Sequence, residues 1–78
     1  MEMERTILNV GIIGLGEVAQ VIHLPVLSAM PEQYRIAALC DISPKLVRYM
    51  GEKYGIANLY TEAAELVKQE DLDAVFLS

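Results

Sequence analysis

The sequence predicts an α/β fold: a doubly wound parallel sheet of four strands, in the order 3-2-1-4, with helices on both faces. Three observations support this prediction. Short aliphatic runs without polar alternation are typical of strands buried on both faces. Segments in which apolar residues recur at helical spacing separate those runs. The two kinds of segment alternate along all 78 residues, and such alternation implies right-handed crossovers and a parallel sheet.

The four expected strands are short and mostly aliphatic. The second ends just before Asp41 and the third ends just before Thr61, so a polar residue follows each of them. The fourth, "AVFL", reads as a buried strand. The expected strand ranges are 7–13, 35–40, 57–60 and 74–77.

The first helix is expected from Glu17, and its apolar residues at roughly helical spacing are Val18, Ile22, Val26 and Ala29. Pro25 lies inside it, removes one backbone donor, and should kink the helix or end its regular part. Met30-Pro31 closes this segment.

The second and third helices have recognisable ends. Ser43 followed by Pro44 is typical of a helix start, and Gly55 suits a left-handed turn at the end. Leu46, Met50 and Tyr54 then share one face of the second helix. Thr61 is the expected cap of the third helix, whose apolar face comes from Leu66 and Val67.

Composition limits the classes of function. The net charge of −5 and the scattered Lys and Arg residues argue against a general nucleic-acid surface. The single cysteine excludes an intrachain disulfide and favours a reducing compartment. No apolar run approaches the ~18 residues of a membrane span, and the start of the chain does not resemble a signal peptide. We therefore expect a soluble, cytoplasmic protein without a membrane or nucleic-acid partner.

The stretch "GLGEVA" is the main candidate for a ligand site. It fits the pattern G-x-G-x-x-A after an expected strand and at the start of an expected helix, the context of a dinucleotide-binding turn. Gly14 permits a tight turn, Gly16 leaves room for a pyrophosphate, and Ala19 lets the helix pack closely on the strand. The unpaired N–H groups of the first helical turn can bind phosphate oxygens. The same two glycines would also suit an ordinary strand-to-helix turn.

Asp41 is the expected partner of this turn. It ends the second strand, slightly beyond the ~20 residues that usually separate such an acid from the glycines. Its carboxylate would accept hydrogen bonds from the adenosine ribose and repel a 2′-phosphate. Ile42 adds no positive charge, which favours NAD over NADP as the cofactor, although Lys45 and Arg48 are near enough in sequence to leave NADP open.

Other candidates point to structure rather than chemistry. His23 lies two turns into the first helix and has a structural or surface role, and Cys40 is a buried strand residue. Glu17 should point outward, because an inward carboxylate would repel a bound pyrophosphate. The sequence contains no cluster with metal-ligand spacing and no Ser/His/Asp set, so we predict no metal site and no catalytic residue in this chain.

From about Leu8 to Ser78 the sequence resembles the N-terminal cofactor domain of the Gfo/Idh/MocA oxidoreductases, the family of glucose–fructose oxidoreductase and inositol dehydrogenase. The resemblance lies in "VGIIGLGEVAQVIHLPVL", "ALCDISP", "EKYG", "LYTEAAELV" and "LDAVFLS". It implies a Rossmann fold that binds NAD(P), followed by a substrate domain. It also implies hydride transfer between nicotinamide and a hydroxyl or carbonyl carbon of a sugar, inositol or similar small molecule.

The resemblance also assigns residues. It gives Gly14, Gly16 and Ala19 to the pyrophosphate turn and Asp41 to the ribose. Ser78 would lie on the nicotinamide side of the cleft. The backbone contacts to the cofactor would come from Leu15, Glu17 and Val18.

The family's Glu-Lys-Pro stretch, which carries its usual proton-transfer lysine, follows the fourth strand and is absent here, and Lys53 in "GEKYG" does not replace it. We therefore expect residues 1–78 to be a partial dinucleotide-binding domain, truncated after the fourth strand. The substrate domain would be absent, and the chain would be inactive by itself.

Two expectations concern partners and alternatives. An open fourth strand with aliphatic residues on both faces should favour self-association of the chain. A non-catalytic nucleotide-binding or redox-sensing module remains an alternative function. So does an S-adenosylmethionine-dependent methyltransferase, which also uses a glycine-rich turn and an acid after the second strand.

Overall fold

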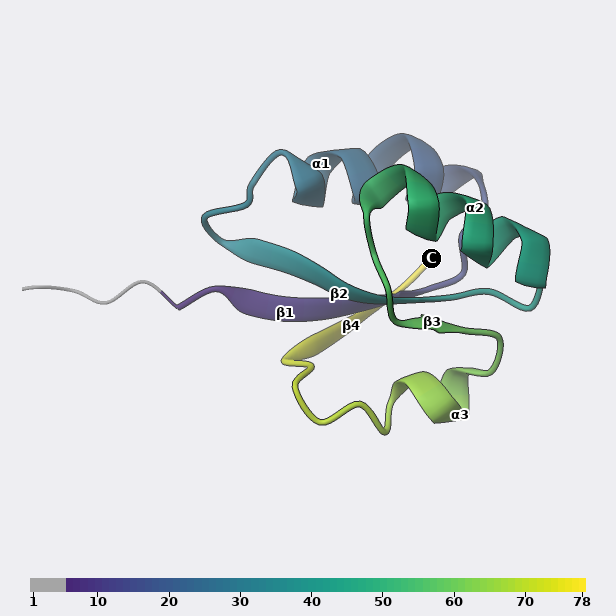
Figure 1. Cartoon of the computed structure of the whole chain (residues 1–78). Helices are drawn as coiled ribbons and strands as arrows, with labels where there is room; N and C mark the ends of the chain where they lie inside the picture. The colour runs from purple at the N-terminus through teal and green to yellow at the C-terminus, as the bar shows by residue number, and fades with distance from the viewer. Residues whose placement is uncertain (1–5) are drawn as a thin grey trace, which may run out of the picture.

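A computed structural model describes residues 6–78 of the chain. It contains one parallel sheet with the strand order β3-β2-β1-β4, as the sequence predicts. One helical layer, with α1 and α2, covers one face of the sheet, and α3 covers the other (Figure 1). The strands are β1 (Leu8–Ile13), β2 (Tyr34–Cys40), β3 (Leu59–Tyr60) and β4 (Ala74–Leu77). The helices are η1 (Ala19–His23), α1 (Leu24–Ser28), α2 (Pro44–Tyr54) and α3 (Ala63–Leu66).

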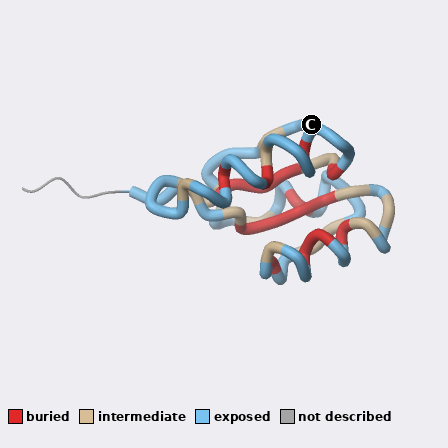
Figure 2. Tube along the Cα trace, turned by 90° about the horizontal axis from the view of Figure 1, so that it is seen from above, coloured by how far each residue is buried: buried red, intermediate tan, exposed pale blue. Residues whose placement is uncertain are grey.

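The core lies mainly between the sheet and the layer of α1 and α2. Buried residues concentrate along the central strands β1 and β2 and on the inner sides of the helices (Figure 2). A smaller cluster of Ala38, Cys40 and Leu66 lies on the α3 side. The larger cluster consists of Val10, Ile12, Leu15, Ala19, Leu24, Leu27, Leu39, Val47, Met50 and Ile56.

The first helix contains a wide turn just before Pro25. The Leu24 N–H donates to the carbonyl of Ala19, five residues back, which defines the π-helical segment η1. Pro25 has no N–H and its ring disfavours a regular α-turn before it, so a widened turn is a physical consequence of the sequence. The expected irregularity at Pro25 is therefore present as a π-turn.

The face that this helix buries differs from the apolar spacing noted in the sequence. Ala19, Leu24 and Leu27 are buried. The recurring residues Val18, Ile22 and Val26 are instead about half exposed, each at 51%. Most positions of this helix are apolar, so the spacing alone did not identify the inward side.

Helix α2 follows the sequence prediction closely. The Ser43 hydroxyl accepts a hydrogen bond from the Leu46 N–H at 3.2 Å, and Gly55 ends the helix with a φ of 69°. Met50 is buried, and Leu46 and Tyr54 pack against the core. Local residue types determine both ends of this helix.

Three details on the α3 side are corrections. The third strand is shorter than predicted and spans only Leu59–Tyr60. Glu62 rather than Thr61 precedes α3, and no side chain caps it. Val67 is exposed, so Leu66 alone supplies the buried face of α3.

Strand β4 has the predicted bounds but not the predicted burial. Only Phe76 is partly buried, while the other three residues of the strand are exposed. The strand pairs with β1 on one side and forms the end of the sheet within residues 6–78. Each helix in this part of the chain is too short or too polar to cross a membrane.

Candidate dinucleotide site

The glycine turn connects β1 to the first helix and is fixed by both neighbouring strands. Gly14 has a φ of 92°, and its N–H donates to the Cys40 carbonyl of β2 at 2.8 Å. On the other side, the Ser78 N–H donates to the Ile13 carbonyl at 3.0 Å. The Ser78 hydroxyl donates to the Gly14 carbonyl at 2.7 Å. A Cβ atom at Gly14 would overlap the Ser78 carbonyl oxygen.

Nothing within residues 6–78 explains why position 16 is a glycine. Its φ is not positive, and a Cβ built on it would meet nothing within 4 Å. The residue is exposed at the start of the helix. The backbone at Gly16 does not require glycine, and the space beside it is open. Close approach of a ligand to the backbone is consistent with both features.

The first turn of the helix presents backbone donors next to this space. The Gln20 N–H donates to the Gly16 carbonyl at 3.0 Å, which is the first hydrogen bond of the helix. The amides of Glu17, Val18 and Ala19 precede that bond, and N–H groups at this position have no partner within a helix. They lie at the positive end of the helix dipole, which favours an anion. The Glu17 side chain is exposed, as predicted, and the Ala19 side chain is buried.

Asp41 lies against the glycine turn. Its Oδ1 accepts a hydrogen bond from the Leu15 N–H and its Oδ2 accepts one from the Ser43 N–H, both at 2.9 Å. Each carboxylate oxygen keeps further acceptor capacity, because an ionised carboxylate has about four lone-pair sites. The structure therefore brings together the two features that the sequence singled out, and Asp41 also holds the turn in place.

Leu15 contributes to the core through its side chain and to the turn through its backbone. Its side chain is fully buried and its N–H is engaged by Asp41. The Gln20 side chain closes the turn by donating from Nε2 to the Leu15 carbonyl at 2.8 Å.

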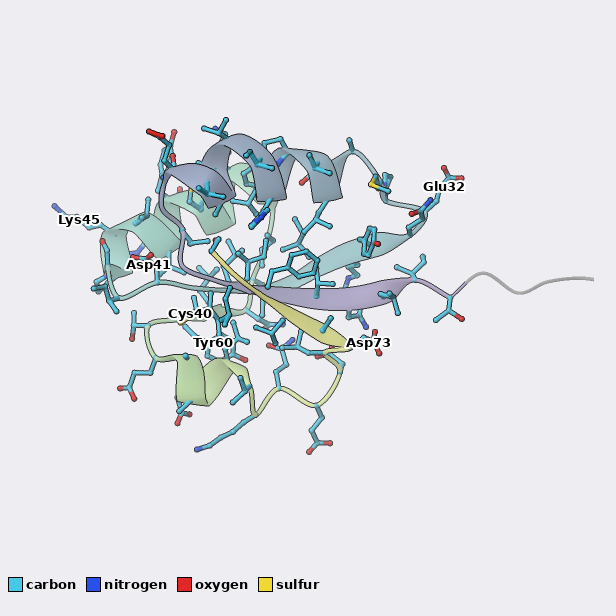
Figure 3. The ribbon with its side chains drawn as sticks, turned by 180° about the vertical axis from the view of Figure 1, so that it is seen from behind. Glu32, Cys40, Asp41, Lys45, Tyr60 and Asp73 are labelled. Carbon is cyan, nitrogen blue, oxygen red and sulfur yellow. The ribbon has the colours of Figure 1, made fainter. Side chains whose placement is uncertain are left out.

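A hollow of about 280 Å³ opens beside Asp41 at the carboxyl ends of the strands. Ile42, at the rim of this hollow, is 90% exposed. Lys45 extends outward from the start of α2 (Figure 3). The hollow is lined by Ile13, Gly14, Cys40, Asp41, Ile42, Thr61 and Ala63.

Thr61 and Ala63 line the hollow, although the sequence had assigned neither residue to the ligand site. They follow β3, and the carboxyl ends of parallel strands lie at one edge of the sheet, so the topology would have identified them. A second hollow of about 410 Å³ lies toward the amino-terminal end of β2 and includes Tyr34, Ala57 and Asn58. Parallel strands place that end opposite the glycine turn.

Cys40 is buried, as predicted, and is not suited to nucleophilic chemistry. Burial raises the pKa of its thiol above the usual 9.0, and the carboxylates of Asp41 and Glu62 raise it further. A thiol with a raised pKa stays protonated near neutral pH. Among residues 6–78, no three His, Cys, Asp or Glu side chains are grouped so that they could hold a metal ion.

Comparisons with known proteins agree with this geometry. A family model described as "Oxidoreductase family, NAD-binding Rossmann fold", that of the Gfo/Idh/MocA proteins, matches residues 8–78. No curated protein matches the chain.

Solved structures of longer proteins are also similar. An oxidoreductase of the Gfo/Idh/MocA family from Vibrio cholerae is 30% identical with a TM-score of 0.78, over 90% of this chain and 22% of that one. A 3-ketoreductase from Actinomadura kijaniata, solved with NADP and TDP-benzene, is 26% identical with a TM-score of 0.81, over 90% and 21%. A scyllo-inositol dehydrogenase from Lactobacillus casei, solved with NAD(H) and scyllo-inositol, shares the fold at 22% identity with a TM-score of 0.82, over 92% and 21%. The chain thus spans about a fifth of the length of these structures.

Proposed function

Because the chain belongs to the Gfo/Idh/MocA oxidoreductase family, we propose that residues 1–78 are the NAD-binding part of a hydride-transferring enzyme. Its substrate would be a sugar, inositol or similar small molecule with a hydroxyl or carbonyl carbon. The substrate class is proposed from the family resemblance. The chain spans about a fifth of the structures that it matches, so the activity is proposed for a longer protein and this chain by itself is proposed to be inactive.

The observation that carries the cofactor proposal is the open space at Gly16. A Cβ there would meet no protein atom within 4 Å, and the backbone does not require glycine. A pyrophosphate that approaches this backbone would account for the missing side chain. The amides of Glu17, Val18 and Ala19 would then donate to the phosphate oxygens.

Asp41 would bind the adenosine ribose. Both carboxylate oxygens are fixed by backbone donors at 2.9 Å, so the group is already oriented before a ligand arrives. The remaining lone pairs would accept hydrogen bonds from the ribose hydroxyls, and hydrogen bonds to a charged group contribute about 1.5–3 kcal/mol each. Ile42 would contact the adenosine from the rim of the hollow, and Ser78 would lie on the nicotinamide side.

The same carboxylate supports NAD rather than NADP. A 2′-phosphate on the ribose would bring a second negative charge close to Asp41, and the neighbouring Ile42 offers no compensating cation. When bound, the nicotinamide supplies or accepts the hydride. The residues of this chain bind and orient the cofactor, and we propose that none of them takes part in the chemical step.

Calorimetric titration of the chain with NAD, NADP and S-adenosylmethionine, each separately, tests the proposal. We expect NAD to bind most tightly and the methyl donor not to bind. Binding of S-adenosylmethionine without either dinucleotide would instead indicate a methyltransferase fragment.

A variant pair sharpens the test. Gly16→Val places a branched side chain in the open space and should weaken NAD binding by about tenfold or more, equal to about 1.4 kcal/mol or more. Ala57→Val adds a similar side chain at an exposed position of the other hollow and should leave binding unchanged. Equal NAD affinity for both variants would contradict the placement of the pyrophosphate.

A further inference from the structure

Gln20 holds two successive carbonyl groups of the glycine turn. Its backbone N–H donates to the Gly16 carbonyl at 3.0 Å, four residues back, as in any α-helix. Its side-chain Nε2 donates to the Leu15 carbonyl at 2.8 Å. No backbone N–H among residues 6–78 donates to the Leu15 carbonyl. The side chain therefore supplies a hydrogen bond that the helix itself does not make.

The three amides of the turn differ in their partners. The Gly14 N–H donates to the Cys40 carbonyl at 2.8 Å, and the Leu15 N–H donates to Asp41 Oδ1 at 2.9 Å. The Gly16 N–H has no hydrogen-bond partner in the part of the chain that the structure describes. Gly16 is exposed, and a Cβ built on it would meet nothing within 4 Å. One backbone donor without a partner therefore borders the open space.

The direction of this donor follows from the planarity of the peptide group. The carbonyl and the N–H of one trans peptide point in opposite directions. Because Gln20 holds the Leu15 carbonyl toward the helix, the Gly16 N–H of the same peptide points away from the helix. The Gly16 carbonyl is held in the same way, so the Glu17 N–H also points away. Successive N–H groups with a common direction form anion-binding concavities.

We propose that Gln20 is a positioning residue for the cofactor, whose side chain orients the Gly16 N–H toward the pyrophosphate. This proposal rests on the proposed dinucleotide function and adds one donor to the amides of the first helical turn. Gln20 acts through the turn and does not contact the cofactor.

The glycine makes such a restraint useful. The peptide between Leu15 and Gly16 turns about ψ of the first residue and φ of the second, and a glycine accepts either sign of φ. Without the side-chain donor, the Leu15 carbonyl is free to turn toward water, and the Gly16 N–H turns with it. Gln20 is itself exposed, whereas the Leu15 side chain lies in the core. Loss of the Gln20 amide should therefore disturb ligand binding more than it disturbs packing.

A pair of variants tests the proposal with three ligands. Gln20→Met keeps the length of the side chain and removes its donor. Gln33→Met makes the same change at an exposed position just before β2, at the opposite end of the sheet from the glycine turn. Each protein is titrated with NAD, ADP and adenosine, followed by NMR.

Gln20→Met should weaken the binding of NAD and ADP about tenfold, the order of effect of losing one hydrogen bond to a charged group. Adenosine has no phosphate, so its affinity should not change. Gln33→Met should bind all three ligands as the wild type does. A purely structural role of Gln20 would weaken adenosine as much as ADP, because the turn also holds Asp41 through the Leu15 N–H.

Hydrogen exchange of the wild type gives a test that does not depend on folding of a variant. The Gly16 amide should exchange quickly in the free protein and become protected when ADP binds. The Gly14 and Leu15 amides should be protected in both states, because they already donate to Cys40 and Asp41.

The outcomes separate this inference from the proposed function. A wild type that binds neither NAD nor ADP would contradict the dinucleotide proposal itself. If the wild type binds both, equal ADP affinity of Gln20→Met and the wild type would overturn only the role of Gln20. An equal loss of ADP and adenosine affinity in Gln20→Met would overturn it as well, as would a Gly16 amide that ADP does not protect.

Discussion

Gly14 and Gly16 belong to one turn, yet the structure gives them different reasons to be glycine. Gly14 has a φ of 92°, and any Cβ there would overlap the Ser78 carbonyl. Gly16 has neither a positive φ nor a neighbour within 4 Å of the place that a Cβ would occupy. The first glycine is required by the fold, and we propose that a ligand accounts for the second.

This difference shows how one short motif can combine two constraints. Pattern matching treats the two positions alike, because both are written as G. Their surroundings separate a glycine that the backbone conformation requires from one that we propose a ligand requires. Substitutions at the two positions should therefore affect different measurements: the free energy of unfolding for Gly14 and the affinity for NAD for Gly16.

The largest effect on stability is expected for Gly14→Ala. A positive φ costs a residue with a Cβ about 1–2 kcal/mol, and the overlap with Ser78 adds to this. Ser78 cannot move away without breaking its hydrogen bonds to Ile13 and Gly14. We expect a loss of about 3 kcal/mol or more, measured by urea unfolding. A variant as stable as the wild type would show that the fold does not need glycine at this position.

Asp41→Asn should have the next largest effect, on both stability and binding. The carboxylate accepts hydrogen bonds from Leu15 and Ser43. An amide side chain has only one oxygen to accept them, so one backbone donor would lose its partner at a cost of about 1–3 kcal/mol. NAD affinity should fall as well, and the preference for NAD over NADP should decrease because the negative charge is gone. Unfolding by urea and titration with both dinucleotides measure the two effects.

Unchanged stability of this variant, together with lost NAD binding, would mean that Asp41 serves only the ligand. Lost stability with unchanged NAD binding would mean that it serves only the turn. We expect Asp41 to affect both stability and binding, because its carboxylate contacts the turn and also borders the hollow.

A smaller effect should separate Gly16→Ala from Gly55→Ala. Gly55 has a φ of 69°, and its Cβ would meet nothing, so only the backbone conformation opposes alanine. The Gly55→Ala variant should therefore be less stable than the wild type by about 1 kcal/mol. Gly16→Ala should leave stability unchanged or raise it by up to about 1 kcal/mol, because alanine restricts the unfolded chain. A Gly16→Ala variant less stable than Gly55→Ala would remove the contrast between the two glycines of the turn.

The sequence predicted those parts of the molecule that depend on local residue types. The strand order, the bounds of β4 and both ends of α2 agree with the structure. Ser43 and Gly55 identify the ends of α2 because a cap and a left-handed turn involve only a few neighbouring residues.

Features that depend on distant neighbours were harder to predict. The inward face of the first helix was not identified, because its apolar residues surround most of the helix and η1 alters the spacing. The burial expected for β4 was wrong, since it depends on what lies beside the strand. Asp41 was singled out, but its bond to Leu15 joins residues 26 apart, and only the folded chain shows it.

The smallest expected effect concerns Cys40, which lines the hollow beside Asp41. Burial, with the nearby carboxylates, raises the pKa of the folded thiol above the usual 9.0. As the pH rises, the unfolded chain therefore loses this proton first. The resulting stabilisation is complete below about pH 9 and is lost as the pH rises through the folded-state pKa. Urea unfolding between pH 7 and pH 10 should show a smaller decline in stability for Cys40→Ala than for the wild type. Other titrating groups are common to both proteins, so an equal decline would show that the thiol is not shifted by its surroundings.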